Sequence, residues 1–182
     1  MLAYKGFDKG LQCRGYQFVM GLNTTEKANC AQNGFHCAEN PLDCLCYYGN
    51  HQDSVYHIVD AGGDIDEDDR DSKISCTELT VLNQLTIEQL ILHGLAYMVD
   101  HPNRESSSQV NEDKATARNG YAIVRGLDPV AKGTKVGDIL AFAKQSLDGR
   151  SIERVAMRKV DGKKVLPDVW YDMELKERGE FL

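Results

Sequence analysis

A polar stretch over residues 101–119 divides this chain into two parts, and no other feature constrains its possible folds as strongly. The stretch is nearly free of large apolar side chains. Such a composition is typical of a linker or a mobile loop, because it offers little surface to bury. The 182 residues then suit an N-terminal domain over residues 1–100 and a small C-terminal module over residues 120–182.

The N-terminal part mixes strand and helix signals. Asn40 before Pro41 predicts the start of one helix, since a polar cap and a proline in the first turn are both favoured there. Apolar residues at helical spacing predict a second helix over residues 86–99, capped by Thr86. The β-branched runs at residues 55–61 and 73–82 predict strands. We therefore expect an α+β fold in which a mixed or antiparallel sheet carries two main helices.

The C-terminal part has shorter apolar runs, which predict a small β-rich module. Asp161-Gly162 stands between two of these runs, and this dipeptide is a strong signal for a tight turn between antiparallel strands. A hairpin over residues 152–170 is the expected result.

Acidic residues dominate the charge of the chain, which is −7 at neutral pH. A chain of this charge is not expected to bind nucleic acid directly, because phosphate binding needs lysines and arginines. Six acids are concentrated in the loop between the two predicted strands, and this loop either serves as a solvated loop or binds a basic partner protein. The candidate partner-binding residues are Asp64, Asp66, Glu67, Asp68, Asp69 and Asp71.

Neither a membrane span nor a leader is expected. No apolar run approaches the roughly 20 residues that a spanning helix needs. The first residues lack a basic region that leads into an apolar stretch, so no signal peptide is predicted. We therefore expect a cytoplasmic protein whose six cysteines are reduced.

The cysteines raise two chemical alternatives. Cys30, Cys37, Cys44 and Cys46 could bind zinc with His36, but their spacing does not match the usual paired ligands, so no metal site is expected. Cys37 could instead act as a nucleophile, with His36, His57 or His93 as its base. No third group that would orient such a base is evident, which makes buried thiols the favoured interpretation.

Residues 34–48 resemble the second signature of ADP-ribosyltransferases, which use NAD. The resemblance implies that Arg14-Gly15 contacts the cofactor, with Lys5-Gly6 as the alternative first motif. Phe35 and either Tyr47 or Tyr48 would flank the nicotinamide ring. The implied catalytic residues are Arg14, His36 and Glu78. His36-Cys37 replaces the usual strand end, so the likeness favours a related structure over turnover.

The chain also resembles an uncharacterised family of small proteins from phages and prophages of Clostridia. The motifs are Tyr4-Lys-Gly-Phe, Cys13-Arg-Gly-Tyr, Gly34-Phe-His with Asn40-Pro-Leu-Asp, and Val160-Asp-Gly with Trp170-Tyr. The resemblance implies a mobile-element origin. From it we expect a counter-defence protein without cofactor that binds and inhibits a host defence protein, as an anti-CRISPR protein does with a CRISPR nuclease effector. The alternative is an ADP-ribosyltransferase-like enzyme that uses NAD.

Overall fold

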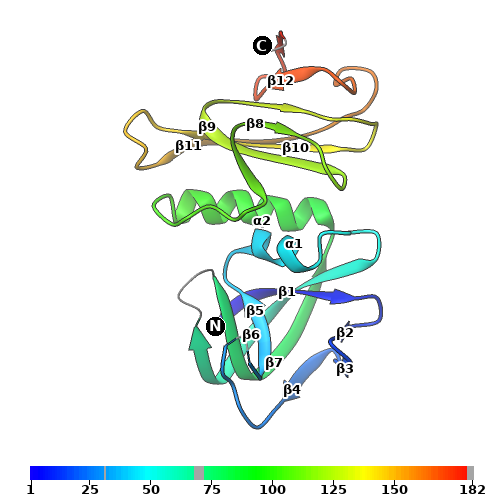
Figure 1. Cartoon of the computed structure of the whole chain (residues 1–182), viewed down its shortest axis with the longest axis vertical. Coiled ribbons are helices and arrows are strands. Elements are labelled where there is room, and N and C mark those ends of the chain that lie inside the picture. Colours follow the sequence, from blue (N-terminus) through cyan, green and yellow to red (C-terminus); the bar gives the residue numbers. More distant parts are fainter. Residues whose placement is uncertain (31, 68–71, 180–182) are drawn as a thin grey trace. The chain divides into compact units, whose positions relative to one another are not determined.

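The described part of the chain is mostly β-structure, with 51% of these residues in strands and 12% in helices. The computed structural model describes residues 1–30, 32–67 and 72–179 (Figure 1). The predicted α+β fold with two main helices is therefore wrong. The strands extend farther into polar sequence than the apolar runs indicated, and the first helix has only a single α-helical turn.

Two compact units make up the chain, Met1–Gly94 and Leu95–Leu182. The division falls inside a helix and not in the polar stretch over residues 101–119. Part of that stretch is not a linker, because Val110–Thr116 forms strand β8. Its polar side chains are mostly exposed, and Ala115 is the residue that it buries.

Unit 1 contains a seven-stranded sheet in which all pairings are antiparallel. The strand order is β3-β2-β1-β5-β7-β4, and β6 pairs with both β1 and β7. The seven strands are β1 (Leu2–Asp8), β2 (Gln12–Cys13), β3 (Tyr16–Gln17), β4 (Gly21–Thr24), β5 (Phe35–Ala38), β6 (Ser54–Glu67) and β7 (Lys73–Leu85). Phe7, Val59 and Ile74 lie in the core of this sheet.

The two predicted helices differ greatly in length. The first is a 3-10 turn, η1 (Pro41–Asp43), followed by the single turn α1 (Cys44–Tyr47). It ends at Tyr47, close to the expected stop at Gly49-Asn50, since Tyr48 leaves helical geometry with φ −127° and ψ 49°. The predicted cap is confirmed, since the Asn40 side chain accepts a hydrogen bond from Leu42 N over 3.1 Å. Tertiary contacts, and not length, therefore hold this short segment in place.

The second helix, α2 (Ile87–Asp100), confirms its prediction closely. Thr86 Oγ1 accepts from Gln89 N over 3.2 Å, and Gln89 Oε1 accepts from Thr86 N over 2.9 Å. This reciprocal pair is a capping box. Inside unit 1, Gly94 lets the helix approach η1 closely, because a Cβ at that position would lie 2.4 Å from Leu42 Cγ.

Unit 2 contains a six-stranded sheet of order β11-β10-β9-β12-β13, with β8 paired to β9. Its further strands are β9 (Tyr121–Lys132), β10 (Ile139–Gln145), β11 (Ile152–Lys159), β12 (Trp170–Asp172) and β13 (Glu177–Arg178). The predicted hairpin over residues 152–170 does not form. β11 pairs with β10, and β12 pairs with β9 and β13. Asp161-Gly162 does turn the chain, but its turn closes on Val165 and not on a partner strand.

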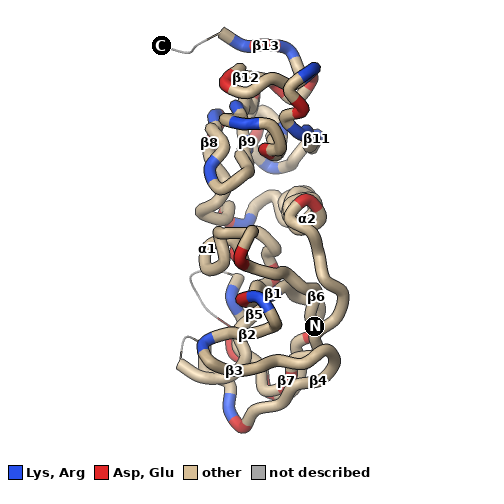
Figure 2. Tube along the Cα trace, turned by 90° about the vertical axis from the view of Figure 1, so that its right-hand side faces the viewer, with Lys and Arg blue, Asp and Glu red and all other residues tan. Residues whose placement is uncertain are grey.

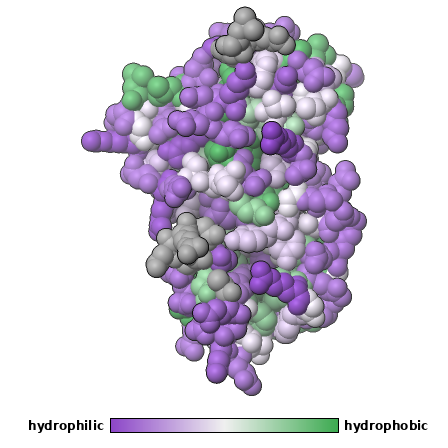
Figure 3. Space-filling model, in the orientation of Figure 1, coloured by the Kyte–Doolittle hydropathy of each residue, from purple (hydrophilic) through white to green (hydrophobic). Residues whose placement is uncertain are grey.

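The surface is largely polar. Figure 2 shows acidic and basic residues distributed over both units, and the face in Figure 3 is mostly hydrophilic with small, separate hydrophobic patches. Within the described residues, no helix is long and apolar enough to cross a membrane.

Candidate functional site

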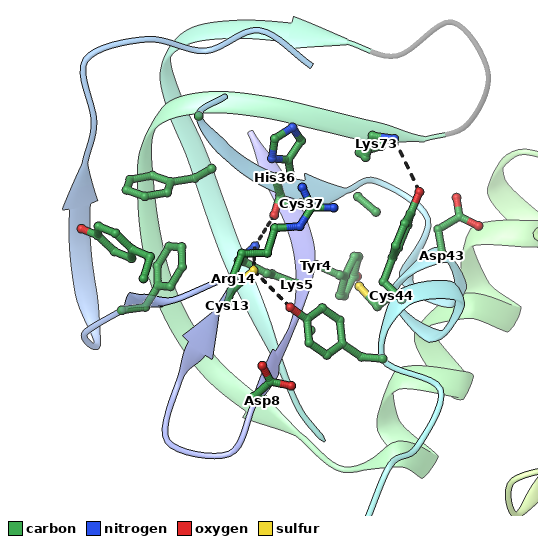
Figure 4. A pocket seen from close by; sticks show the side chains of 18 of the residues that line it. Tyr4, Lys5, Asp8, Cys13, Arg14, His36, Cys37, Asp43, Cys44 and Lys73 are labelled. Atoms are coloured by element: carbon green, nitrogen blue, oxygen red, sulfur yellow. Dashed lines mark hydrogen bonds between the residues drawn. The ribbon is translucent and has the colours of Figure 1, made fainter. Parts of the chain in front are cut away.

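Unit 1 encloses a cavity of about 700 Å³, which we call the unit 1 cavity (Figure 4). Its lining comes from strands β1, β2, β3 and β5 and from the η1–α1 segment, with Lys73 at the start of β7. The side chains that matter below are aromatic, basic or thiol groups: Tyr4, Lys5, Cys13, Arg14, Tyr16, Phe18, Phe35, His36, Cys37, Cys44, Tyr47, Tyr48 and Lys73. Such a mixture of apolar walls and convergent polar groups is typical of small-molecule sites.

The β2–β3 hairpin contributes an exposed part of the lining. Cys13 pairs with Tyr16, and the loop between them consists of Arg14 and Gly15. Both loop residues have positive φ angles, 49° and 82°, which is the geometry of a type I′ turn. Arg14 therefore stands at the tip of a tight hairpin, exposed and at the rim of the cavity.

The η1–α1 segment supplies a buried part of the lining, and β1 determines its position. A Cβ at Gly6 would lie 2.5 Å from Cδ2 of Tyr48, so the Tyr48 ring packs directly on the backbone of β1. Ser72 joins the segment to the start of β7. Its hydroxyl donates to Asp43 Oδ2 over 2.6 Å and accepts from Asn40 N over 2.9 Å. Glycine at position 6 is thus required for the shape of the site.

Aromatic rings form a contiguous cluster at the cavity. Tyr16 lies 4.6 Å from Phe18 and 5.0 Å from Phe35, and Phe18 lies 4.9 Å from Phe35, measured between ring centroids. Tyr47 and Tyr48 add two more rings from the end of α1. These surfaces suit a flat, apolar ligand group.

Basic residues gather at the same cavity, although the whole chain is acidic. Lys5, Arg14 and Lys73 all line it. The pKa of His36 is lowered, mainly by burial and then by the positive charges of these three residues. Because a nearby positive charge disfavours the protonated imidazole, the three cations add to the effect of burial on His36. Asp8 and Asp43 are the acids of the lining, and Ser72 already donates to Asp43.

Five of the six residues predicted for a transferase site meet in this cavity. Arg14, His36, Phe35, Tyr47 and Tyr48 all line it. Glu78 does not, because it lies on the exposed side of β7 beside Gly62 and Gly63. The structure therefore assembles the predicted ring-binding and basic residues, but without the predicted acid.

The other predicted residues lie elsewhere or have different neighbours. His57 Nδ1 is 3.0 Å from Leu82 O, and His93 Nδ1 is 2.9 Å from Tyr4 Oη, so neither histidine adjoins Cys37. The side chain of Cys37 instead interacts with Cys76. All six cysteines carry thiols and not disulfides. Within the described part of the chain, no group of three or more histidine, cysteine or acidic residues is arranged to hold a metal ion.

The predicted acidic loop is partly a strand. Asp64, Asp66 and Glu67 are exposed residues near the end of β6, whereas Asp68, Asp69 and Asp71 lie outside the described residues. Asp66 Oδ2 accepts a hydrogen bond from Cys30 N over 2.6 Å. This bond joins the end of β6 to the loop between β4 and β5.

Sequence reasoning missed Cys13 and Lys73 and gave Lys5 only as an alternative. A signal for Lys5 was available in the sequence. Lys5 shares one face of its strand with Ala3 and Phe7, and a charged residue is unusual on such an apolar face. Nothing in the local sequence marks Lys73, which reaches the cavity only through the pairing of β7 with β5.

Comparison with known proteins gives one family. Residues 1–93 match the model of a domain of unknown function, DUF7666. No curated protein matches the chain, and neither does a solved structure. The matched range contains every residue that lines the cavity. Since it spans more than half of the 182 residues, the chain belongs to the DUF7666 family.

Proposed function

We propose that unit 1 is a binding module for a small anion that carries a flat ring, such as a mononucleotide. The observation that carries this proposal is the convergence of Lys5, Arg14 and Lys73 on a cavity of about 700 Å³ that also presents a cluster of aromatic rings. Cations favour a phosphate or carboxylate, and the rings favour a flat group. The combination suits one ligand that carries both parts.

Arg14 is the most accessible of the three cations. It lies at the tip of a two-residue turn, and it is exposed. Within the described residues, no carboxylate forms an ion pair with it. Its guanidinium presents several donors in one plane, which suits a phosphate or carboxylate. Arg14 is therefore the residue whose replacement tests the proposal most directly.

The first experiment compares adenosine monophosphate with its two halves, adenosine and inorganic phosphate. Binding is followed by calorimetry and by the NMR signals of the His36 imidazole. We expect the monophosphate to bind more tightly than either half, and to raise the pKa of His36, because the bound anion offsets the neighbouring positive charges. The proposal fails if none of the three compounds gives a saturable response.

Arg14→Asn is the matched variant. Asn-Gly is the preferred pair for a type I′ turn, and an arginine with positive φ is strained by about 1 kcal/mol. The substitution should therefore leave the free energy of unfolding unchanged or slightly higher. It should weaken binding of the monophosphate about tenfold and leave the weaker binding of adenosine unchanged. Equal losses for both compounds would contradict a role in anion binding.

NAD is a ligand of the proposed class, and its turnover is the alternative function. That reaction would need an acid near the ring, and Glu78 does not line the cavity. Incubation with NAD and a bacterial lysate tests this alternative through labelled transfer or release of nicotinamide. Turnover that is lost in Glu78→Ala would favour the transferase. Turnover that persists in the variant would exclude Glu78 as the catalytic acid.

A second candidate function concerns the acids at the end of β6. The exposure of Asp64, Asp66 and Glu67 supports binding of a basic protein, in line with the prediction of a phage-derived counter-defence protein in the cytoplasm of a bacterial host. Asp64→Lys with Glu67→Lys reverses this charge and spares Asp66, which accepts from Cys30 N. Capture of a CRISPR nuclease effector should be lost in the double variant. Unchanged capture would exclude this surface as the contact.

A further inference from the structure

The thiol of Cys13 lies between two hydrogen-bond donors in the unit 1 cavity (Figure 4). Lys5 Nζ donates to its Sγ over 3.7 Å, and Tyr48 Oη donates over 3.1 Å. A thiolate accepts such bonds much better than a thiol does. Both donors therefore point at the sulfur from positions that suit a negatively charged acceptor, and the thiolate is the nucleophilic form of cysteine.

Lys5 gives an independent reason for negative charge at this place. Its exposed fraction is only 4%. Its ammonium group also donates to His36 O over 2.5 Å and lies 5.3 Å and 5.2 Å from the ring centroids of Phe7 and Phe18. Among the described residues, no carboxylate forms an ion pair with it. Buried cations are usually paired, and the Cys13 sulfur is the contacting group that can ionise.

Tyr48 keeps its proton and remains a donor. Its pKa is raised, first by burial and then by the hydrogen bond to Cys13. The Tyr48 ring cannot move closer to β1, because it already packs against the backbone at Gly6. The phenol is therefore held in place beside the sulfur.

The other thiols of the cavity are more buried, and their pKa values are raised although the charge of Lys5 acts on them too. Burial raises the pKa of Cys44 to about 12. The hydrogen bond to Cys76, together with burial, raises the pKa of Cys37. Both residues are buried, whereas Cys13 is half-buried and lines the cavity. Cys46 is exposed on α1 and does not line the cavity, so it serves as an internal reference.

We propose that Cys13 is a nucleophile that forms covalent adducts with electrophilic carbon compounds, and preferentially with those that carry an anionic group. The thiol releases its proton to solvent. A sulfur electron pair then forms a bond to the electrophilic carbon, and the leaving group departs with the electron pair of the broken bond. The reactivity of Cys13 depends on Lys5 and Tyr48. The preference for an anion rests on the proposed function, through Arg14 and Lys73.

Alkylation rates at single cysteines test the two parts separately. The folded chain is treated with iodoacetamide, which is neutral, and with iodoacetate, which is anionic; each reaction releases iodide. Peptide mass spectrometry follows Cys13 and Cys46 in the same sample. We expect Cys13 to react with iodoacetamide about tenfold faster than Cys46, although Cys46 is more exposed. A Cys13 rate equal to or below that of Cys46 overturns the nucleophile.

Tyr48→Phe removes one donor and keeps the ring that packs on Gly6. The iodoacetamide rate of Cys13 should fall about fivefold, while that of Cys46 stays the same. Tyr121→Phe is the matched control, because it removes a phenol of unit 2 that donates to Gln109 Oε1 over 3.0 Å and does not line the cavity. It should leave the Cys13 rate unchanged. Equal rates in wild type and Tyr48→Phe would contradict the activating role of Tyr48.

The ratio of the iodoacetate rate to the iodoacetamide rate reports the anion preference. This ratio should be higher at Cys13 than at Cys46, and it should fall toward the Cys46 value in Arg14→Asn. A fast iodoacetamide reaction with equal ratios at both cysteines would support the nucleophile and overturn the anion preference. Slow alkylation of Cys13 in a chain that binds adenosine monophosphate would overturn the nucleophile alone.

Discussion

Two walls of the same cavity are built in different ways. We call Phe35, Cys37 and Cys44 the frame wall, since all three are buried. We call Cys13, Arg14 and Tyr16 the hairpin wall, since they are half-buried or exposed on one tight hairpin. The frame wall belongs to the packing of unit 1. The hairpin wall carries the accessible cation and the activated thiol, and it can change with little cost to the fold.

The most direct challenge to this comparison is truncation in the frame wall. Phe35 is 5% exposed and contacts the rings of Tyr16 and Phe18. Phe35→Ala should lower the free energy of unfolding by about 3–5 kcal/mol, because it leaves a cavity in the core. Denaturant titration measures this loss. Tyr16→Ala, in the hairpin wall, should cost about 1 kcal/mol, and equal losses would break the distinction between the walls.

A smaller loss of stability is expected from a change that displaces Tyr48. This residue follows α1, which carries Cys44 of the frame wall, and it donates to Cys13 of the hairpin wall. Gly6→Ala would place a Cβ against the Tyr48 ring, and such overpacking costs about 1–3 kcal/mol. The displaced phenol should also leave Cys13, so the alkylation rate of Cys13 should fall together with stability. Gly179→Ala is a suitable control, because its Cβ would meet nothing within 4 Å. An unchanged Cys13 rate in Gly6→Ala would show that the walls are independent.

The smallest expected effect is on the pH dependence of stability, and it tests the environment of His36 at the cavity. The pKa of His36 is lowered from its ordinary value of 6.5, first by burial and then by Lys5, Arg14 and Lys73. The unfolded chain therefore binds a proton at higher pH than the folded chain does, so stability is lost as pH falls below 6.5. His36→Gln should reduce this loss between about pH 7.5 and about pH 5.5. Parallel stability curves for both proteins would contradict the lowered pKa of His36.

Local signals in the sequence predicted local structure well. The Asn40 cap and the Thr86–Gln89 capping box are confirmed, since each depends on neighbours within three residues. The predicted α+β class was wrong because it underestimated the strands. The length of a strand depends on the partner strand with which it pairs, and this partner is not evident from the strand's own residues. The acids at the end of β6 are held in a strand by pairing with β7, although nothing in their own composition favours one.

The candidate site could be predicted only in part for the same reason. The motifs around Arg14 and around residues 34–48 contain most of the aromatic lining. The contacts that give Cys13 its character come from Lys5 and Tyr48, which are 8 and 35 residues away from it in the chain. Spacing within a motif carries no information on such contacts, because the pairing of β1, β2 and β5 creates them.

The two-residue turn at Arg14-Gly15 has a consequence for how a site of this kind can diversify. Its first position accepts any residue that tolerates a left-handed backbone, and asparagine, aspartate and glycine do so most readily. Exchange of that one side chain would replace a cation at the mouth of the cavity by a neutral or acidic group and leave the frame untouched. Ligand selection in such a protein can thus evolve, or be redesigned, one codon at a time.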